Sequence, residues 1–126
     1  MGVSEPWQLM MWKETGGPAF TAMEGDIPIA CGGIVIVWSG VGIAWTVISD
    51  AARKHGLLLT KAARRILDDV VRSHALRRID AMVVDGDERN ARWIQVLGFS
   101  PENGRANRYM PNGDDAIRYE RLAWKL

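Results

Sequence analysis

The sequence is poor in the residues that build covalent or metal-bound frameworks. It holds a single cysteine, Cys31, and two histidines among 126 residues. One cysteine excludes an internal disulfide, and no group of cysteine and histidine has the spacing of a zinc site. A chain of this length buries an adequate core without either device. We therefore predict no metal site and a fold held by side-chain packing.

The sequence also lacks an excess of charge of one sign. Lys and Arg total 16 against 15 Asp and Glu, so the formal net charge is +1. Because nucleic-acid-binding domains are usually far more basic, nucleic acid is not an expected partner. Hydrophobic residues make up 48% of the chain, which is typical of a folded domain. We predict one domain over residues 1–126, with 1–18 as a short N-terminal segment.

Neither a targeting segment nor a membrane span is predicted. Residues 1–17 lack the basic region and apolar run of a signal peptide. The uncharged stretch 27–49 is long enough to cross a bilayer. It contains four glycines, however, and the letters WSGVG at its centre are typical of a turn. We therefore expect two buried strands there and no membrane partner.

The remaining patterns alternate between strand and helix. Apolar and β-branched runs predict strands at 19–25, 27–39, 42–49 and 77–85. A pair of glycines inside the second of these predicts a bulge at 32–33, because glycine weakens regular strand pairing.

Helical spacing of apolar residues predicts a helix over 53–78, and a shorter one over 88–98. Asp87 is the expected N-cap of the shorter helix, and Gly98 its end. The segment 5–14 is compatible with one further helix.

Two last strands are expected at 107–113 and 116–126, around the turn PNGDD. Crossover helices between strands of this order predict an α/β sandwich around a largely antiparallel sheet.

The shorter predicted helix runs into the letters LGF, at Leu97, Gly98 and Phe99. With this ending the C-terminal half resembles the GNAT superfamily of acetyltransferases, in which a helix ending in LGF follows the fifth strand. The resemblance covers roughly residues 19–122. It implies a GNAT-like three-layer sandwich, with a mixed, mostly antiparallel sheet. The superfamily normally places a strand and two helices before strand two, so the N-terminal elements are reduced here.

Residues 24–45 are similar to a segment of a short GNAT-like branch encoded by phages and prophages. Some members of that branch are virion components. This narrower resemblance implies a virion or host-cytoplasm location, and as partners other phage virion proteins or a second copy of the chain.

The resemblance also identifies a candidate loop for acetyl-CoA. The superfamily pattern Q/R-x-x-G-x-G/A binds pyrophosphate through backbone N–H groups at a helix N-terminus. The corresponding residues are Arg53, Lys54, His55, Gly56, Leu57 and Leu58. Arg53 and Gly56 match, whereas Leu58 stands where glycine or alanine is usual. Its side chain either blocks the phosphate or turns inward. The alternative is that these residues bind no ligand and form only the basic first turn of a surface helix.

No catalytic residue is predicted. The superfamily's proton-donating tyrosine corresponds to Ile94, which has no proton to give, and the strand 42–49 offers no base. Cys31 is expected to be a buried thiol, since apolar residues flank it. His55 and His74 each stand alone.

Six tryptophans are a high number for this length. Trp7, Trp12, Trp38 and Trp124 are candidates for an interaction surface, because tryptophan is favoured at interface centres. Packing on the domain's own sheet is the alternative.

Two functions compete on these observations. The unmatched loop position and the missing tyrosine favour a non-catalytic virion or tail assembly component, with no cofactor. The alternative is an acetyl-CoA-dependent N-acetyltransferase acting on an unknown amine.

Overall fold

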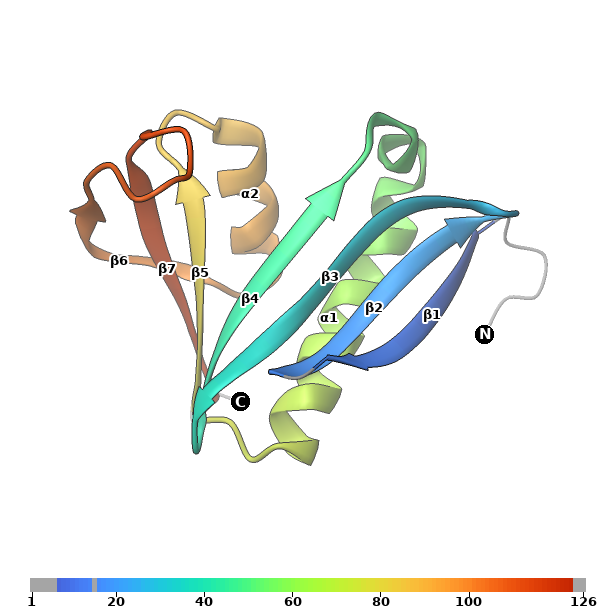
Figure 1. Ribbon diagram of the computed structural model, residues 1–126, viewed down its shortest axis with the longest axis horizontal. Coiled ribbons are helices and arrows are strands. Elements are labelled where there is room, and N and C mark those ends of the chain that lie inside the picture. The colour runs from blue at the N-terminus through green and yellow to red at the C-terminus, as the bar shows by residue number, and fades with distance from the viewer. Residues whose placement is uncertain (1–6, 15, 124–126) are drawn as a thin grey trace.

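The computed structural model describes residues 7–14 and 16–123, and Figure 1 shows its elements. In chain order these are β1 (Trp7–Glu14), β2 (Gly17–Glu24), β3 (Ile27–Trp38), β4 (Val41–Ile48), the 3-10 helix η1 (Asp50–His55), α1 (Gly56–Ser73), β5 (Arg78–Val84), α2 (Glu88–Val96), β6 (Ser100–Ala106) and β7 (Ala116–Leu122).

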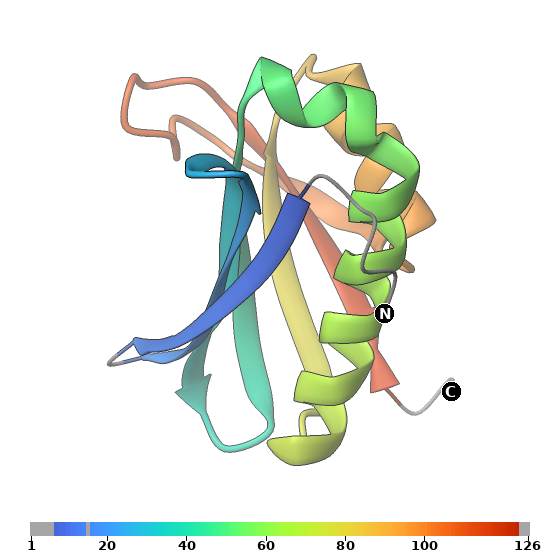
Figure 2. The same cartoon turned by 90° about the vertical axis from the view of Figure 1, so that its right-hand side faces the viewer.

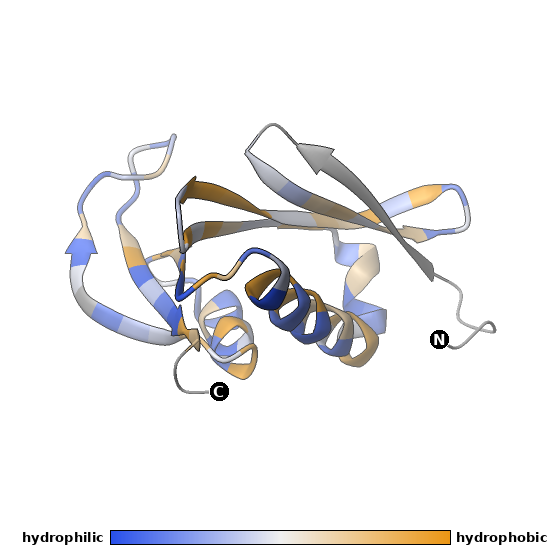
Figure 3. Cartoon of the chain, turned by 90° about the horizontal axis from the view of Figure 1, so that it is seen from below, coloured by the Kyte–Doolittle hydropathy of each residue, from blue (hydrophilic) through white to orange (hydrophobic). Residues whose placement is uncertain are grey.

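The seven strands form one sheet in the order β1-β2-β3-β4-β5-β7-β6. Every neighbouring pair is antiparallel except β4 and β5, which are parallel because α1 carries the chain back between them. The predicted fold class, α/β around a mixed and mostly antiparallel sheet, is confirmed. Both described helices lie on the same face of the sheet (Figures 2 and 3). Neither has the length and apolar character needed to cross a bilayer.

The main core lies between this face and the two helices. Leu67, Val70 and Val71 of α1 pack with buried residues of the central strands, among them Ile34 and Ile79. This matches the apolar spacing of the sequence, since residues three and four apart share one face of a helix. The α1 position is therefore set mainly by apolar burial.

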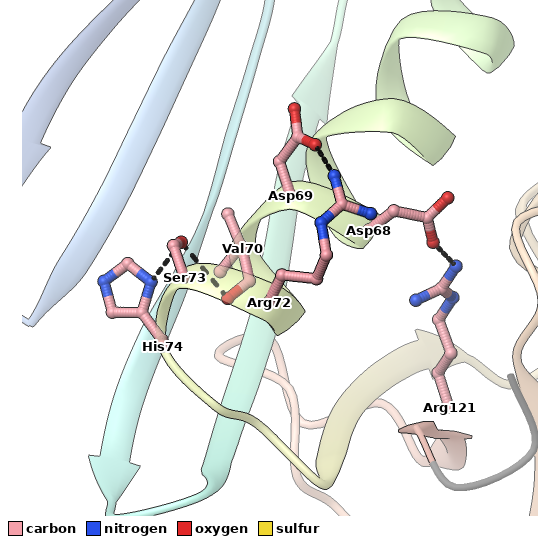
Figure 4. A network of polar contacts seen from close by, with 7 residues as sticks. All are labelled: Asp68, Asp69, Val70, Arg72, Ser73, His74 and Arg121. Carbon is pink, nitrogen blue, oxygen red and sulfur yellow. Dashed lines mark hydrogen bonds and ion pairs between the residues drawn. The ribbon is translucent and has the colours of Figure 1, made fainter.

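A single arginine on β7 ties both helices to the sheet. Arg121 Nη2 donates to Asp68 Oδ1 of α1 at 2.6 Å, and its Nε donates to the carbonyl of Leu97 at 3.0 Å. Figure 4 shows the pair with Asp68, beside the exposed pair of Asp69 and Arg72 on the same helix. The Arg121 side chain is 10% exposed, so its charge acts in a largely desolvated place.

The cap predictions hold, whereas the prediction for segment 5–14 is wrong. Asp87 accepts the backbone N–H of Asn90 as N-cap of α2, and Gly98 follows its C-cap with a φ of +100°. Residues 5–14 were compatible with a helix, but residues 7–14 form strand β1. Eight antiparallel pairs with β2 supply backbone hydrogen bonds that override local propensity.

The bulge predicted at residues 32–33 does not occur there. The β3 irregularities lie where Ala22 and Met23 pair with Ala30 and Pro28, and near Trp38, not at Gly32–Gly33. Both glycines stay in regular pairing. Instead, they lack a Cβ where β3 meets its neighbours closely.

The strand predicted at 107–113 is also misplaced. The structure has strand β6 at Ser100–Ala106 instead, and residues 107–113 belong to a loop. Pro101 is tolerated because β6 is an edge strand, where a missing N–H leaves no partner unsatisfied. The predicted helix 53–78 is shorter as well, since η1 precedes α1 and α1 ends at Ser73.

Candidate functional site

The sheet opens between its two parallel strands. β4 and β5 pair only over three positions, from Val41 with Arg78 to Ile43 with Asp80. Beyond them the strands diverge in a V (Figure 1). β5 stays paired with β7 along its whole length, and β4 with β3 along its whole length. Residues 44–48 of β4 therefore face the opening with no described strand on that side.

Charge fastens the β5 arm of the V to its neighbouring strands. Arg78 donates to Asp80 at 2.5 Å, to Glu102 at 2.5 Å and to Glu120 at 3.4 Å, which joins β5, β6 and β7. Partial burial lowers the pKa of Arg78, but the hydrogen bonds to Glu102 and Asp80 outweigh it and raise the pKa above its usual value. The arginine therefore stays charged and holds β5 to β6 and β7, whereas β4 takes no part in these ion pairs.

A cavity of about 480 Å³ lies at the opening. Its walls come from β2 to β5, both helices and the loop after β6, and most of the lining is apolar. The lining side chains with polar groups include Cys31, Thr46, Asp87, Asn90 and Tyr109. A cavity of this size and character is typical of a small-molecule site.

Both helix N-termini lie at the open end of the V. Parallel strands point the same way, so the segments that follow β4 and β5 begin at the same edge (Figure 1). A helix N-terminus carries partial positive charge and N–H donors without intrahelical partners. At α2 the Asp87 carboxylate already caps this end, so the start of α1 is the end suited to an anionic ligand.

Gly56 begins α1 at this edge and leaves open space. Its φ is −52°, an ordinary helical value, and an added Cβ would meet no heavy atom within 4 Å. The glycine is therefore not demanded by the backbone or by packing within the chain. Open space at this position leaves room for a phosphate beside the helix start, although the Gly56 N–H itself donates to the carbonyl of Arg53.

Leu58 does not obstruct that space. It packs with a second apolar cluster built on Ala22, Ile29 and Ala52, between the sheet and the start of α1. Leu57 is the exposed member of the pair, at 70%. Of the two outcomes left open by the sequence, the inward one is therefore observed.

The basic side chains of this loop are paired with carboxylates. His55 is buried, and its Nε2 lies 2.8 Å from Glu24 Oε2, which Lys54 also contacts at 3.3 Å. The hydrogen bond from His55 is the main reason that the pKa of Glu24 is lowered. Arg53 lies 3.2 Å from Asp50. His55 thus has a structural contact, whereas the half-exposed Arg53 and Lys54 form surface pairs, which contribute little to stability.

A chain of hydrogen bonds connects the two helices at the cavity. Trp93 of α2 donates to the Thr60 hydroxyl at 3.0 Å, and Thr60 donates to the Gly56 carbonyl at 2.7 Å. The first turn of α1 is thereby held against α2. Ile94, at the position of the superfamily's tyrosine, lines the same cavity.

The other candidates from the sequence are dispersed. Cys31 is partly exposed on β3 rather than buried, and His74 lies beyond the far end of α1. Trp38 is 66% exposed at the end of β3, and Trp7 and Trp12 fall in β1. Trp124 lies outside the described residues, so the tryptophan interaction surface stays a prediction. No group of metal ligands occurs in the part of the chain that the structure describes.

Sequence reasoning missed Tyr109. Its segment was interpreted as a strand, although the structure makes it a loop that lines the cavity. An aromatic residue two positions before a Pro-Asn-Gly turn was the available signal, since turn-flanking side chains often project from a scaffold.

No protein-family model matches the sequence, and no curated protein matches it. Solved structures do. A ribosomal-protein-S5-alanine acetyltransferase from Vibrio fischeri has a TM-score of 0.73 at 19% identity, over 83% of this chain and 61% of its own. A spermidine N-acetyltransferase SpeG chimera from Vibrio cholerae and hSSAT has a TM-score of 0.73 at 17% sequence identity. The match covers 89% of this chain and 70% of the chimera. A GNAT-family acetyltransferase from Bacillus anthracis has a TM-score of 0.69 at 17%, over 82% and 65%.

These similarities show the GNAT fold. They also correct the main functional prediction, because the similar structures are acetyltransferases and none named here is a virion protein. The non-catalytic virion assembly role is therefore wrong. The phage-encoded branch, phage partners and a virion location receive no support.

Proposed function

We propose that this protein is an acetyl-CoA-dependent N-acetyltransferase, which transfers the acetyl group of the thioester to an amine. The observation that carries the proposal is the V-shaped opening between β4 and β5, with its apolar cavity and the N-terminus of α1 at its open end. The names of the structurally similar proteins support the same reaction class.

The start of α1 fits the pyrophosphate of acetyl-CoA. Open space above Gly56 lets phosphate oxygens reach the backbone N–H groups of the first helical turn. Arg53 and Lys54 are exposed enough to exchange their carboxylate partners for phosphate, and Lys61 is exposed on the same helix. Because Leu58 packs inward, its bulky side chain does not block the approach of a phosphate to the helix start.

The open edge of β4 fits the extended arm of the same molecule. This arm contains amide groups, and residues 44–48 have backbone groups that face no described strand. An extended chain of amides binds such an edge as an added strand. The apolar cavity wall then buries the methylene groups of the arm. The acetyl end comes to lie inside the V, in the cavity lined by β4, β5, α2 and the loop after β6.

No described side chain of the cavity serves as an evident base. Asp87 lines it, but both of its carboxylate oxygens accept hydrogen bonds from Asn90. We propose that water carries the proton of the attacking amine to solvent.

Calorimetric titration with acetyl-CoA tests the cofactor half of the proposal. We expect one saturable site in the wild type and its loss in Gly56→Trp. The substitution fills the space above the helix start, but φ and packing at Gly56 both tolerate a side chain. Arg65→Trp is the matched control, because it adds the same side chain to an exposed position about two and a half turns along α1.

Release of CoA thiol with a panel of small primary amines, spermidine included, tests the transfer half. No binding by the wild type, or equal affinity in Gly56→Trp, would refute the proposal. Equal loss of binding in both tryptophan variants would do the same, because the effect would then not belong to the helix start.

A further inference from the structure

Among the described residues that line the cavity, three have ionisable side chains: Cys31, Asp87 and Tyr109. Breaking a thioester leaves a thiolate, which a nearby acid protonates. Asp87 is committed to capping α2 through both oxygens. Cys31 lies on β3, which β4 separates from the opening. Tyr109 is the remaining proton source.

Tyr109 projects from a loop that hydrogen bonds hold on both sides. The backbone N–H of Arg108 donates to Asp115 Oδ1 at 2.9 Å, and that of Met110 donates to the carbonyl of Asp114 at 3.0 Å. Gly113 closes the tip by donating to Met110 at 2.8 Å. The residues immediately before and after the tyrosine are thus fixed.

The base of this loop is attached to the end of β5. Asp85 donates its backbone N–H to the carbonyl of Asp115 at 3.0 Å, and Arg105 contacts the carboxylates of Asp85 at 2.9 Å and Asp115 at 3.5 Å. β5 forms one arm of the V, so the loop keeps a defined position relative to the opening. A reacting group on such a support is more precisely placed than one on a free loop.

Arg108, directly before the tyrosine, has a φ of +55°. A residue other than glycine is strained in such a conformation, which persists only where the surroundings impose it. Here it redirects the chain so that the next side chain lines the cavity. The Tyr109 hydroxyl has no hydrogen-bond partner among the described residues, and the residue is 55% exposed, so its proton is available.

We infer that Tyr109 is the proton donor to the leaving sulfur, in place of the tyrosine that Ile94 replaces on α2. This assignment rests on the proposed acetyltransferase function. The amine nitrogen forms a bond to the thioester carbonyl carbon, and the carbon–sulfur bond breaks with its electron pair going to sulfur. The sulfur takes the phenolic proton of Tyr109. Water then returns to the phenolate the proton that the amine nitrogen has lost.

Carbon-13 labelling of the tyrosine rings tests whether Tyr109 meets the ligand. The chain has only two tyrosines, Tyr109 and Tyr119, so two ring signals are expected and each Phe variant assigns one. Tyr119 is buried in the core and does not line the cavity. Saturation with CoA is expected to shift the Tyr109 signal and to leave the Tyr119 signal in place.

Kinetics of the same two variants test the proton transfer. Tyr109→Phe is expected to lower kcat by about 10²–10⁴-fold, the usual contribution of a general acid, with little change in affinity for acetyl-CoA. Tyr119→Phe is the matched control and keeps kcat. CoA thiol release is followed with the amine panel and with water alone, and circular dichroism checks that both variants fold.

The outcomes separate the two proposals. A wild type that binds no acetyl-CoA overturns both. A wild type that binds acetyl-CoA but releases no thiol overturns the proton donor and leaves only the cofactor site. Normal turnover in Tyr109→Phe, or an unmoved Tyr109 signal, overturns the assignment alone. A kcat loss as large in Tyr119→Phe as in Tyr109→Phe also overturns it.

Discussion

Replacement of Arg121 by methionine tests whether one side chain holds both helices on the sheet. The variant keeps an apolar stem of similar length but removes the donors to Asp68 and to the carbonyl of Leu97. Leaving a buried carbonyl without its partner costs about 1–3 kcal/mol. The ion pair adds only about 0–1 kcal/mol, because the Asp68 side chain is 44% exposed and screened by solvent.

We therefore expect Arg121→Met to lower the free energy of unfolding by about 1–4 kcal/mol. At about 4 °C per kcal/mol for a domain of this size, Tm falls by about 4–16 °C. Urea unfolding followed by tryptophan fluorescence gives the first quantity, and calorimetry gives the second.

Arg72→Met is the matched control, because it removes an arginine from the exposed pair with Asp69 on the same helix (Figure 4). Its expected cost is within about 0.5 kcal/mol. Asp68→Asn separates the two contacts of Arg121 and is expected to cost less than half as much as Arg121→Met. Equal stability of the Arg121 and Arg72 variants would refute the reasoning, since it would mean that the Leu97 contact contributes nothing.

Two further predictions concern contacts at the junction of η1 and α1. Leu58→Ala is expected to lower stability by about 1–2 kcal/mol, because the half-buried side chain packs inward, and to leave acetyl-CoA affinity unchanged; tighter binding would mean that Leu58 obstructs the phosphate. Glu24→Gln tests the contact with His55. The folded-state pKa of Glu24 lies below its ordinary 4.5, so this carboxylate stabilises the fold above that pH, and the contribution is lost as the pH falls below it. The free energy of unfolding, measured between pH 3 and 6, should depend less steeply on pH in the variant than in the wild type. The same dependence on pH in both proteins would contradict the assignment.

Much of the fold follows from local patterns. The central strands, the apolar face of α1 and both ends of α2 were predictable, because each depends on residues close together in the sequence. Asp87 caps its own helix, and Gly98 adopts a φ that other residues avoid. Segments without such signals were misjudged. Residues 7–14 pair with a neighbouring strand, and residues 107–113 form a loop held by contacts across its base.

The sequence by itself determined the GNAT-like arrangement of strands and helices and the position of the loop before α1. The tertiary structure alone decided whether that loop is open. Leu58 turns toward Ala22 and Ile29, and Glu24 on another strand engages His55 and Lys54. It also placed Tyr109 in the lining of the cavity that Ile94 lines as well. These contacts join residues that are far apart in the sequence. They depend on how separate strands and helices pack together, and residue spacing alone does not predict that.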